Sequence, residues 1–159
     1  MRLKPSQITS KTSFNHMNIM KNNNENSKGT LKGSCLCQAV VYELTQLDMP
    51  IWICHCQTCR KANAASEVAT AGVQRSHFRL LCGEEKLTAF ESSPGKLRYF
   101  CSVCGSHLFS ARDGQTHVIL RVATLDTDPG LRPLGHIWTS QDQPWLDGST
   151  QPCFAERSS

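Results

Sequence analysis

Seven of the nine cysteines lie in three short clusters whose spacing is typical of metal ligands. The clusters are Cys35-x-Cys37, Cys54-x-Cys56-x-x-Cys59 and Cys101-x-x-Cys104. The sequence shows no secretory signal, and disulfide frameworks are rare in reducing compartments. The clustering therefore favours metal binding over disulfides. We expect the two isolated cysteines, Cys82 and Cys153, to be small buried hydrophobic residues.

The segment FCSVCGS (residues 100–106) has the pattern of a zinc knuckle, in which a tight turn directs two thiolates at one ion. Gly105 suits the end of that turn, where φ often becomes positive. A redox Cys-x-x-Cys would usually open a helix, whereas both flanking segments have the pattern of strands. A tetrahedral zinc needs four ligands, and the Cys-x-Cys pair supplies the missing two. The sequence thus predicts a structural zinc site formed by Cys35, Cys37, Cys101 and Cys104.

The segment ICHCQTCRK (residues 53–61) contributes three further thiols, Cys54, Cys56 and Cys59. Three protein ligands with an open fourth position are typical of a catalytic zinc. The alternative is a second structural site closed by one of the histidines, His55, His107, His117 or His136. His55 fits that role poorly, because adjacent residues of an extended segment point to opposite faces. Both forms imply a second zinc, so we expect two zinc ions per chain.

Short apolar segments separated by turn residues predict an all-β domain. The expected strands cover residues 39–44, 50–54, 66–73, 77–83, 84–92, 96–101, 106–111 and 117–125. Only residues 59–66 favour a helix, of one or two turns. Residues 136–154 are rich in aromatic and turn residues, and we expect irregular structure there.

Residues 1–28 form an Asn-rich basic segment with few apolar residues and no periodicity, which predicts a disordered tail ahead of a zinc-binding domain at residues 29–159. Met20 would also serve as a translation start. This tail accounts for the net charge of +4, since Lys and Arg equal Asp and Glu from Gly29 onward. The neutral charge of the domain argues against nucleic acid as its partner. No stretch approaches the roughly 18 apolar residues of a membrane helix, so we expect a cytoplasmic protein without membrane association.

The three clusters, in this order, resemble those of the glutathione-dependent formaldehyde-activating enzyme family, which includes centromere protein V-type proteins. The matching stretches within residues 29–154 are GSCLCQAVVY, CHCQTCRK, FCSVCGS, Leu125-Asp126 and HIWTSQDQPW. The resemblance implies a zinc-containing β-tent fold of short antiparallel strands. It assigns the Cys-x-Cys and Cys-x-x-Cys pairs to a structural zinc, and Cys54, Cys56 and Cys59 to a catalytic-type site. Gln38 departs from the family, which often has glycine after the first pair.

The activity that the resemblance implies is that of a carbon–sulfur lyase of the S-(hydroxymethyl)glutathione synthase type, with glutathione and formaldehyde as reactants. A zinc site suits this chemistry, because a free thiol with a pKa of about 8.5 is mostly protonated at neutral pH. Metal binding deprotonates sulfur. The zinc site could also act in two other ways. The metal could polarise the aldehyde oxygen, or a labile cysteine ligand could exchange with the substrate sulfur.

Candidate substrate contacts are less distinctive than the cysteines. Arg60 and Lys61 follow the third thiol directly, and His136 and Trp138 have side chains suited to a pocket. Arg98 and Arg121 lie within strand patterns, and we expect them on exposed faces. Two alternatives to an enzyme remain, a non-catalytic zinc scaffold that binds a protein or nucleic acid and a glutathione carrier without turnover.

Overall fold

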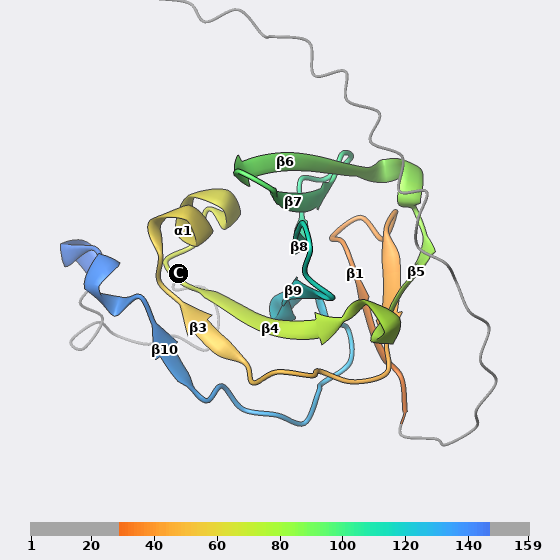
Figure 1. Cartoon of the computed structure of the whole chain (residues 1–159), viewed down its shortest axis with the longest axis horizontal. Coiled ribbons are helices and arrows are strands. Elements are labelled where there is room, and N and C mark those ends of the chain that lie inside the picture. The colour runs from red at the N-terminus through yellow and green to blue at the C-terminus, as the bar shows by residue number, and fades with distance from the viewer. Residues whose placement is uncertain (1–28, 147–159) are drawn as a thin grey trace, which may run out of the picture.

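The computed structural model describes residues 29–146, which form two mainly antiparallel sheets and one short α-helix (Figure 1). The helix is α1 (Gln57–Asn63). The strands are β1 (Leu31–Ser34), β2 (Val41–Leu44), β3 (Trp52–Cys54), β4 (Val68–Gln74), β5 (Phe78–Cys82), β6 (Leu87–Ser93), β7 (Lys96–Cys101), β8 (His107–Arg112), β9 (His117–Arg121) and β10 (Gly135–Ile137). The predicted all-β class is confirmed. Residues 1–28 and 147–159, with the predicted tail and Cys153, lie outside the described residues.

The smaller sheet has the order β1-β2-β5, and the larger has the order β10-β3-β4-β9-β8-β7-β6. All neighbours pair antiparallel except β10, which runs parallel to β3 at the edge of the larger sheet. The larger sheet curls so that β6 and β7 lie across from β4, with α1 beside the open end of the curl (Figure 1). This curl gives the larger sheet an inner face, which side chains from several strands share.

The main hydrophobic core lies on the other face of the larger sheet, where it packs against β2 and β5. A row of contacting aromatic rings runs through this core, with ring centroids 5.3 Å apart for Tyr42 and Phe78, 5.0 Å for Phe78 and Phe109, and 4.6 Å for Phe109 and Tyr99. Gly33 is required beside it, because a Cβ atom there would lie 2.3 Å from the Tyr42 ring. The core therefore fixes β1 closely against β2, and with it the loop that begins at Cys35.

Leu125-Asp126 follows β9 and ties back to β1. Leu125 forms an isolated bridge with Gly33, and the Asp126 N–H donates to the Lys32 carbonyl at 2.9 Å. The Ser34 hydroxyl donates to Asp126 Oδ1 at 3.1 Å. This motif therefore holds the first strand, and the cysteines after it, in place.

Two local expectations are wrong. His136 and Ile137, expected to be irregular, form β10 together with Gly135, because the backbone of β3 offers an unpaired edge. Cys82, expected to be buried, is exposed, because it ends β5 at the edge of the smaller sheet. Within residues 29–146, no helix is long and apolar enough to cross a membrane.

Candidate functional site

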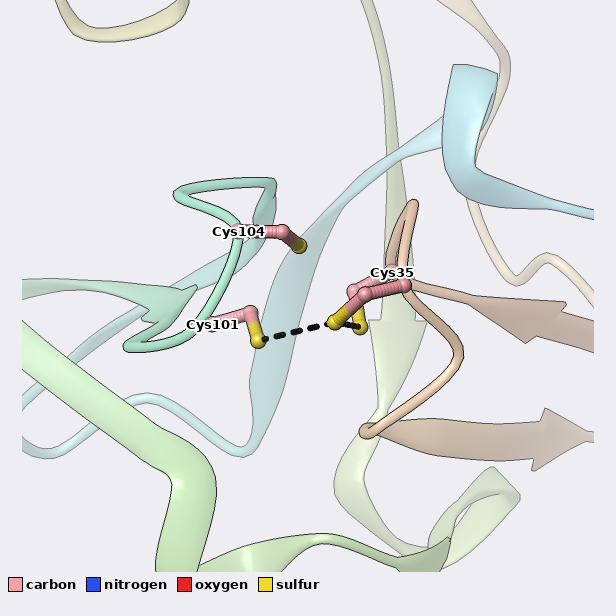
Figure 2. A group of neighbouring side chains, drawn as sticks. Cys35, Cys101 and Cys104 are labelled. Atoms are coloured by element: carbon pink, nitrogen blue, oxygen red, sulfur yellow. Dashed lines mark hydrogen bonds between the residues drawn. The ribbon is translucent and has the colours of Figure 1, made fainter.

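Two loops bring four cysteines together beside the core. Cys35 and Cys37 lie in the loop after β1, and Cys101 and Cys104 lie where β7 leads into β8 (Figure 2). The four Sγ atoms lie within 4.8 Å of one another, with 3.6 Å between those of Cys35 and Cys37 and 3.9 Å between those of Cys37 and Cys101. Four sulfurs about 2.3 Å from a tetrahedral zinc stand about 3.8 Å apart. The cluster fits a zinc ion whose four positions are all filled by cysteine.

The backbone of both loops is shaped for this convergence. Gln38 and Gly105 have φ angles of 60° and 76°, so each loop reverses through a left-handed residue. The Val40 N–H donates to Cys35 Sγ at 3.3 Å. Hydrogen bonds from the Ser106 hydroxyl and backbone lower the pKa of Cys104 to about 5. The contacts at Cys104 favour its thiolate, the form of cysteine that binds metal.

The second cluster lies where β3 ends and α1 begins. Cys54 ends β3, Cys56 is the N-cap of α1, and Cys59 lies in its first turn. Their Sγ atoms lie within 4.8 Å of one another, and the Cys59 N–H donates to Cys56 Sγ at 3.3 Å. Burial raises the pKa of Cys54 to about 12, so a partner of positive charge is needed to hold it as a thiolate. Zinc would supply that charge, and three converging thiols fit it because its charge favours deprotonated sulfur.

Among residues 29–146, no fourth His, Cys, Asp or Glu joins these three thiols within the same distance. The His55 ring lies instead against His136, with 2.8 Å between His55 Nε2 and His136 Nδ1. The geometry therefore favours the open form of this cluster over closure by a histidine.

The inner face of the larger sheet borders a cavity of about 440 Å³ that reaches the second cluster. Its lining combines Cys54, Cys56 and Cys59 with Trp52 and Trp138, and adds polar and cationic side chains from the facing strands. Those side chains are Ser92, Ser93, Lys96, Arg98, Ser110, Arg112 and Arg121. A cavity of this size is in the range of small-molecule sites.

Arg98 and Arg121 are buried at this cavity, only 5% and 3% exposed, so the expectation that they lie on exposed faces is wrong. Among the described residues, Nε and Nη1 of Arg98, Nε of Arg121 and Oγ of Ser110 have no hydrogen-bond partner. A buried donor without a partner costs about 1–3 kcal/mol, and more when it is charged. These donors therefore indicate a polar or anionic ligand in the cavity.

The charges around the cavity support this interpretation. Burial lowers the pKa of Arg121, while the neighbouring thiols of Cys59, Cys54 and Cys56 act in the opposite direction. Burial and the three nearby arginines also lower the pKa of Lys96. The site therefore places a group of cations next to three thiols, an arrangement that suits an anionic compound carrying a reactive sulfur.

The four predicted substrate contacts are placed differently. Trp138 lines the cavity, whereas Arg60, Lys61 and His136 are absent from its lining. Arg60 donates from Nε to the His55 carbonyl at 3.1 Å and from Nη2 to the Gln141 carbonyl at 3.2 Å. Lys61 is exposed on α1, and His136 lies beside His55. Their contact with substrate stays a prediction.

Comparison with known proteins identifies the relatives of this chain. The family model described as "glutathione-dependent formaldehyde-activating enzyme" matches residues 30–141. A crystal structure of a Rhodobacter sphaeroides protein, a structural-genomics target, is also similar, with a TM-score of 0.54 and 25% sequence identity. The match covers 66% of this chain and 98% of that chain.

Proposed function

The chain belongs to the glutathione-dependent formaldehyde-activating enzyme family, and we propose that it is a zinc enzyme that joins glutathione to formaldehyde. In this reaction the glutathione sulfur loses its proton and bonds to the aldehyde carbon. The carbonyl π bond breaks and its oxygen takes up a proton, which gives S-(hydroxymethyl)glutathione. The reverse reaction is a carbon–sulfur lyase reaction, so the enzyme is of the carbon–sulfur lyase type.

The observation that carries the proposal is that Cys54, Cys56 and Cys59 border the same cavity as two buried arginines, each of which has guanidinium donors without a partner within residues 29–146. Glutathione carries a thiol at its centre and a carboxylate at each end. Arg98 and Arg121 would bind a carboxylate through donors that have no partner within residues 29–146. The thiol would then lie toward the cysteines, since both groups border the same cavity.

Zinc bound by these three cysteines would supply a fourth position at which a thiol is held as its thiolate. The chain itself supplies the electrostatic setting. The Cys59 N–H stabilises Cys56 as a thiolate, and Arg98 favours the same charge state, so the pKa of Cys56 is lowered although burial acts to raise it. Arg121, close to all three thiols, adds further positive charge. The cluster of Cys35, Cys37, Cys101 and Cys104 would hold the structural zinc.

The described cysteines form no disulfides, since all eight in residues 29–146 are free thiols. We therefore place the enzyme in the reducing cytoplasm. The domain would span residues 29–159, with residues 1–28 as a tail.

Exchange NMR on mixtures of glutathione and labelled formaldehyde tests the proposal, because it measures the rate of adduct formation at equilibrium. The zinc-loaded protein should raise this rate above the spontaneous rate, and Cys56→Ala should return it to the spontaneous value. Cys82→Ala is the matched control, because Cys82 is an exposed thiol outside the cavity. Tight binding of glutathione with no gain in rate would make the protein a carrier. If the protein neither binds glutathione nor raises the rate, it would be a non-catalytic zinc scaffold.

A further inference from the structure

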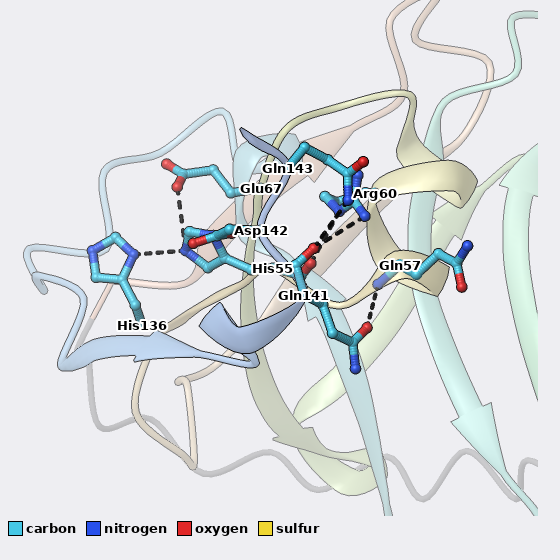
Figure 3. Close-up of polar contacts among 8 residues, drawn as sticks. All are labelled: His55, Gln57, Arg60, Glu67, His136, Gln141, Asp142 and Gln143. Carbon is cyan, nitrogen blue, oxygen red and sulfur yellow. Dashed lines mark hydrogen bonds and ion pairs between the residues drawn. The ribbon is translucent and has the colours of Figure 1, made fainter. Parts of the chain in front are cut away.

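A third group of potential metal ligands lies outside the cavity, at the edge of the larger sheet where β10 pairs with β3 (Figure 3). His55 Nε2 lies 2.8 Å from His136 Nδ1 and 3.4 Å from Glu67 Oε2. These three ligand atoms lie within 4.8 Å of one another. On the other side of the same ring, His55 Nδ1 lies 2.5 Å from Asp142 Oδ1. None of these side chains lines the cavity.

The backbone holds these residues in place from several directions. The His55 N–H donates to the Ile137 carbonyl at 3.0 Å, which fixes β3 against the end of β10. Arg60 bridges the carbonyls of His55 and Gln141, and the Gln57 N–H donates to Gln141 Oε1 at 2.8 Å. The start of α1 is thereby joined to the turn that precedes Asp142. The group is thus built on fixed backbone, although Glu67 and His136 are exposed.

The group brings two imidazole nitrogens and a carboxylate oxygen to one point, where a cation would bind all three. The Asp142 carboxylate can only accept a hydrogen bond, so it assigns the proton of a neutral His55 ring to Nδ1. His55 Nε2 then presents a lone pair toward Glu67 Oε2, which is also an acceptor. A ligating histidine whose other nitrogen donates to a carboxylate is a recurrent feature of metal sites.

We propose that His55 Nε2, His136 Nδ1 and the Glu67 carboxylate bind a divalent transition-metal ion of the zinc class, with Asp142 orienting His55. Two imidazoles and one carboxylate form a donor set that such ions accept. Ligands about 2.0–2.1 Å from a tetrahedral zinc stand about 3.3 Å apart. The 3.4 Å between His55 Nε2 and Glu67 Oε2 matches this spacing, whereas the 2.8 Å between His55 Nε2 and His136 Nδ1 is shorter, so the two rings must separate slightly to admit an ion. The exposed Glu67 and His136 side chains have room for the remaining adjustment.

This ion is distinct from the one proposed at the thiols. Cys54 and Cys56 flank His55 in sequence, yet their sulfurs border the cavity while the His55 ring meets β10. The edge ion clamps β10 to β3, and Trp138, the residue after β10, lines the cavity. Its role is therefore to hold one wall of the cavity.

The test uses the full chain with its cysteine sites loaded with zinc, titrated with Co²⁺. We expect one further ion per chain, with weak visible absorption and without the near-ultraviolet band that a cobalt–thiolate bond gives. Cobalt X-ray absorption should report nitrogen and oxygen ligands only. Glu67→Gln and His136→Gln should each weaken this binding by at least about tenfold, and Asp142→Asn by about 10–100-fold.

The matched control is His77→Gln, which removes a ring that likewise pairs with an aspartate, since His77 Nδ1 lies 2.8 Å from Asp48 Oδ1. It should leave cobalt binding unchanged. Saturation without an additional ion, binding that survives both His136→Gln and Glu67→Gln, or sulfur in the cobalt shell would each overturn the proposal. Zinc retained by the cysteines and the rate of adduct formation are separate readouts, so this site and the proposed enzyme activity can fail independently.

Discussion

Arg98 and Arg121 are the residues that most sharply restrict the choice of ligand. Both are almost fully buried, and both keep donors without partners among the described residues. Arg121 lies near all three thiols and Arg98 near Cys56, so both would act on the cluster and on a bound anion together. A ligand with a carboxylate and a thiol satisfies both needs, whereas a neutral thiol leaves the arginine donors unpaired.

Arg98→Met should therefore weaken the use of glutathione far more than the use of 2-mercaptoethanol, which has no carboxylate. Loss of a charge-assisted hydrogen bond corresponds to about a 10–100-fold fall in kcat/KM for glutathione. Any effect of Arg98 on the cysteines changes kcat/KM for glutathione and for 2-mercaptoethanol alike. The ratio of these two kcat/KM values therefore isolates carboxylate binding. Arg79→Met, which removes an exposed arginine paired with Glu43, is the control. Equal losses for both thiols would refute carboxylate binding by Arg98.

Ala64 is a second residue with a measurable consequence. It caps the C-terminus of α1 with φ 48° and ψ 42°, a left-handed conformation that favours glycine. Ala64→Gly should stabilise the protein by up to about 1 kcal/mol, because relief of the strain exceeds the added entropy of the unfolded chain. Ala62→Gly, inside the same helix, should destabilise it by up to about 1 kcal/mol. Urea unfolding measures both changes, and a shared sign would contradict this account of the cap.

At the scale of elements, the cysteine-bearing loops join parts of the fold that are distant in sequence. The loop after β1 belongs to the smaller sheet and the loop after β7 to the larger one. A zinc held by both would stabilise the fold as a cross-link. The second cluster joins β3 only to the adjacent α1, so its loss leaves the contact between the sheets intact.

Cys104→Ala should consequently unfold or aggregate the protein, since a structural zinc contributes on the order of 10 kcal/mol to folding. Cys56→Ala should preserve the fold and lose only the second ion. The two residues form a matched pair because each is half-buried, so neither change opens a large void in the core. Thermal unfolding combined with metal analysis compares them. An equal fall in Tm would argue against separate structural and reactive sites.

The elements also show how much of the fold the sequence could predict. The strands from β4 to β9 combine apolar patterns with turn residues, and their approximate positions were predictable. The short β10 has no such pattern, because its formation depends on the unpaired edge of β3. The cysteines could be found by type and spacing. The sequence could not identify Arg98 and Arg121 as buried residues of the site. Neither β7 nor β9 turns these side chains to solvent, so the alternation of polar and apolar residues along them does not distinguish an exposed face.

At the scale of the whole molecule, the positive net charge lies in residues 1–28 and the remainder is balanced. Residues 29–146, the part of the chain that the structure describes, supply the strand pairings of both sheets and the thiols of both clusters. We therefore expect deletion of residues 1–19 to leave Tm and metal content unchanged. Calorimetry and metal analysis of the shortened chain test this. A loss of more than about 1 kcal/mol, several degrees in Tm, would show that these residues contribute to the domain.

The most direct measurement of the central claim is the absorption spectrum of protein with cobalt at Cys54, Cys56 and Cys59 during titration with glutathione. If that site has an open position facing the cavity, glutathione sulfur should add a thiolate-to-cobalt band in the near ultraviolet. S-Methylglutathione, whose sulfur cannot ionise, should give a much weaker change, and Cys56→Ala should abolish the response. A spectrum that no thiol alters would contradict the claim and show a closed metal site.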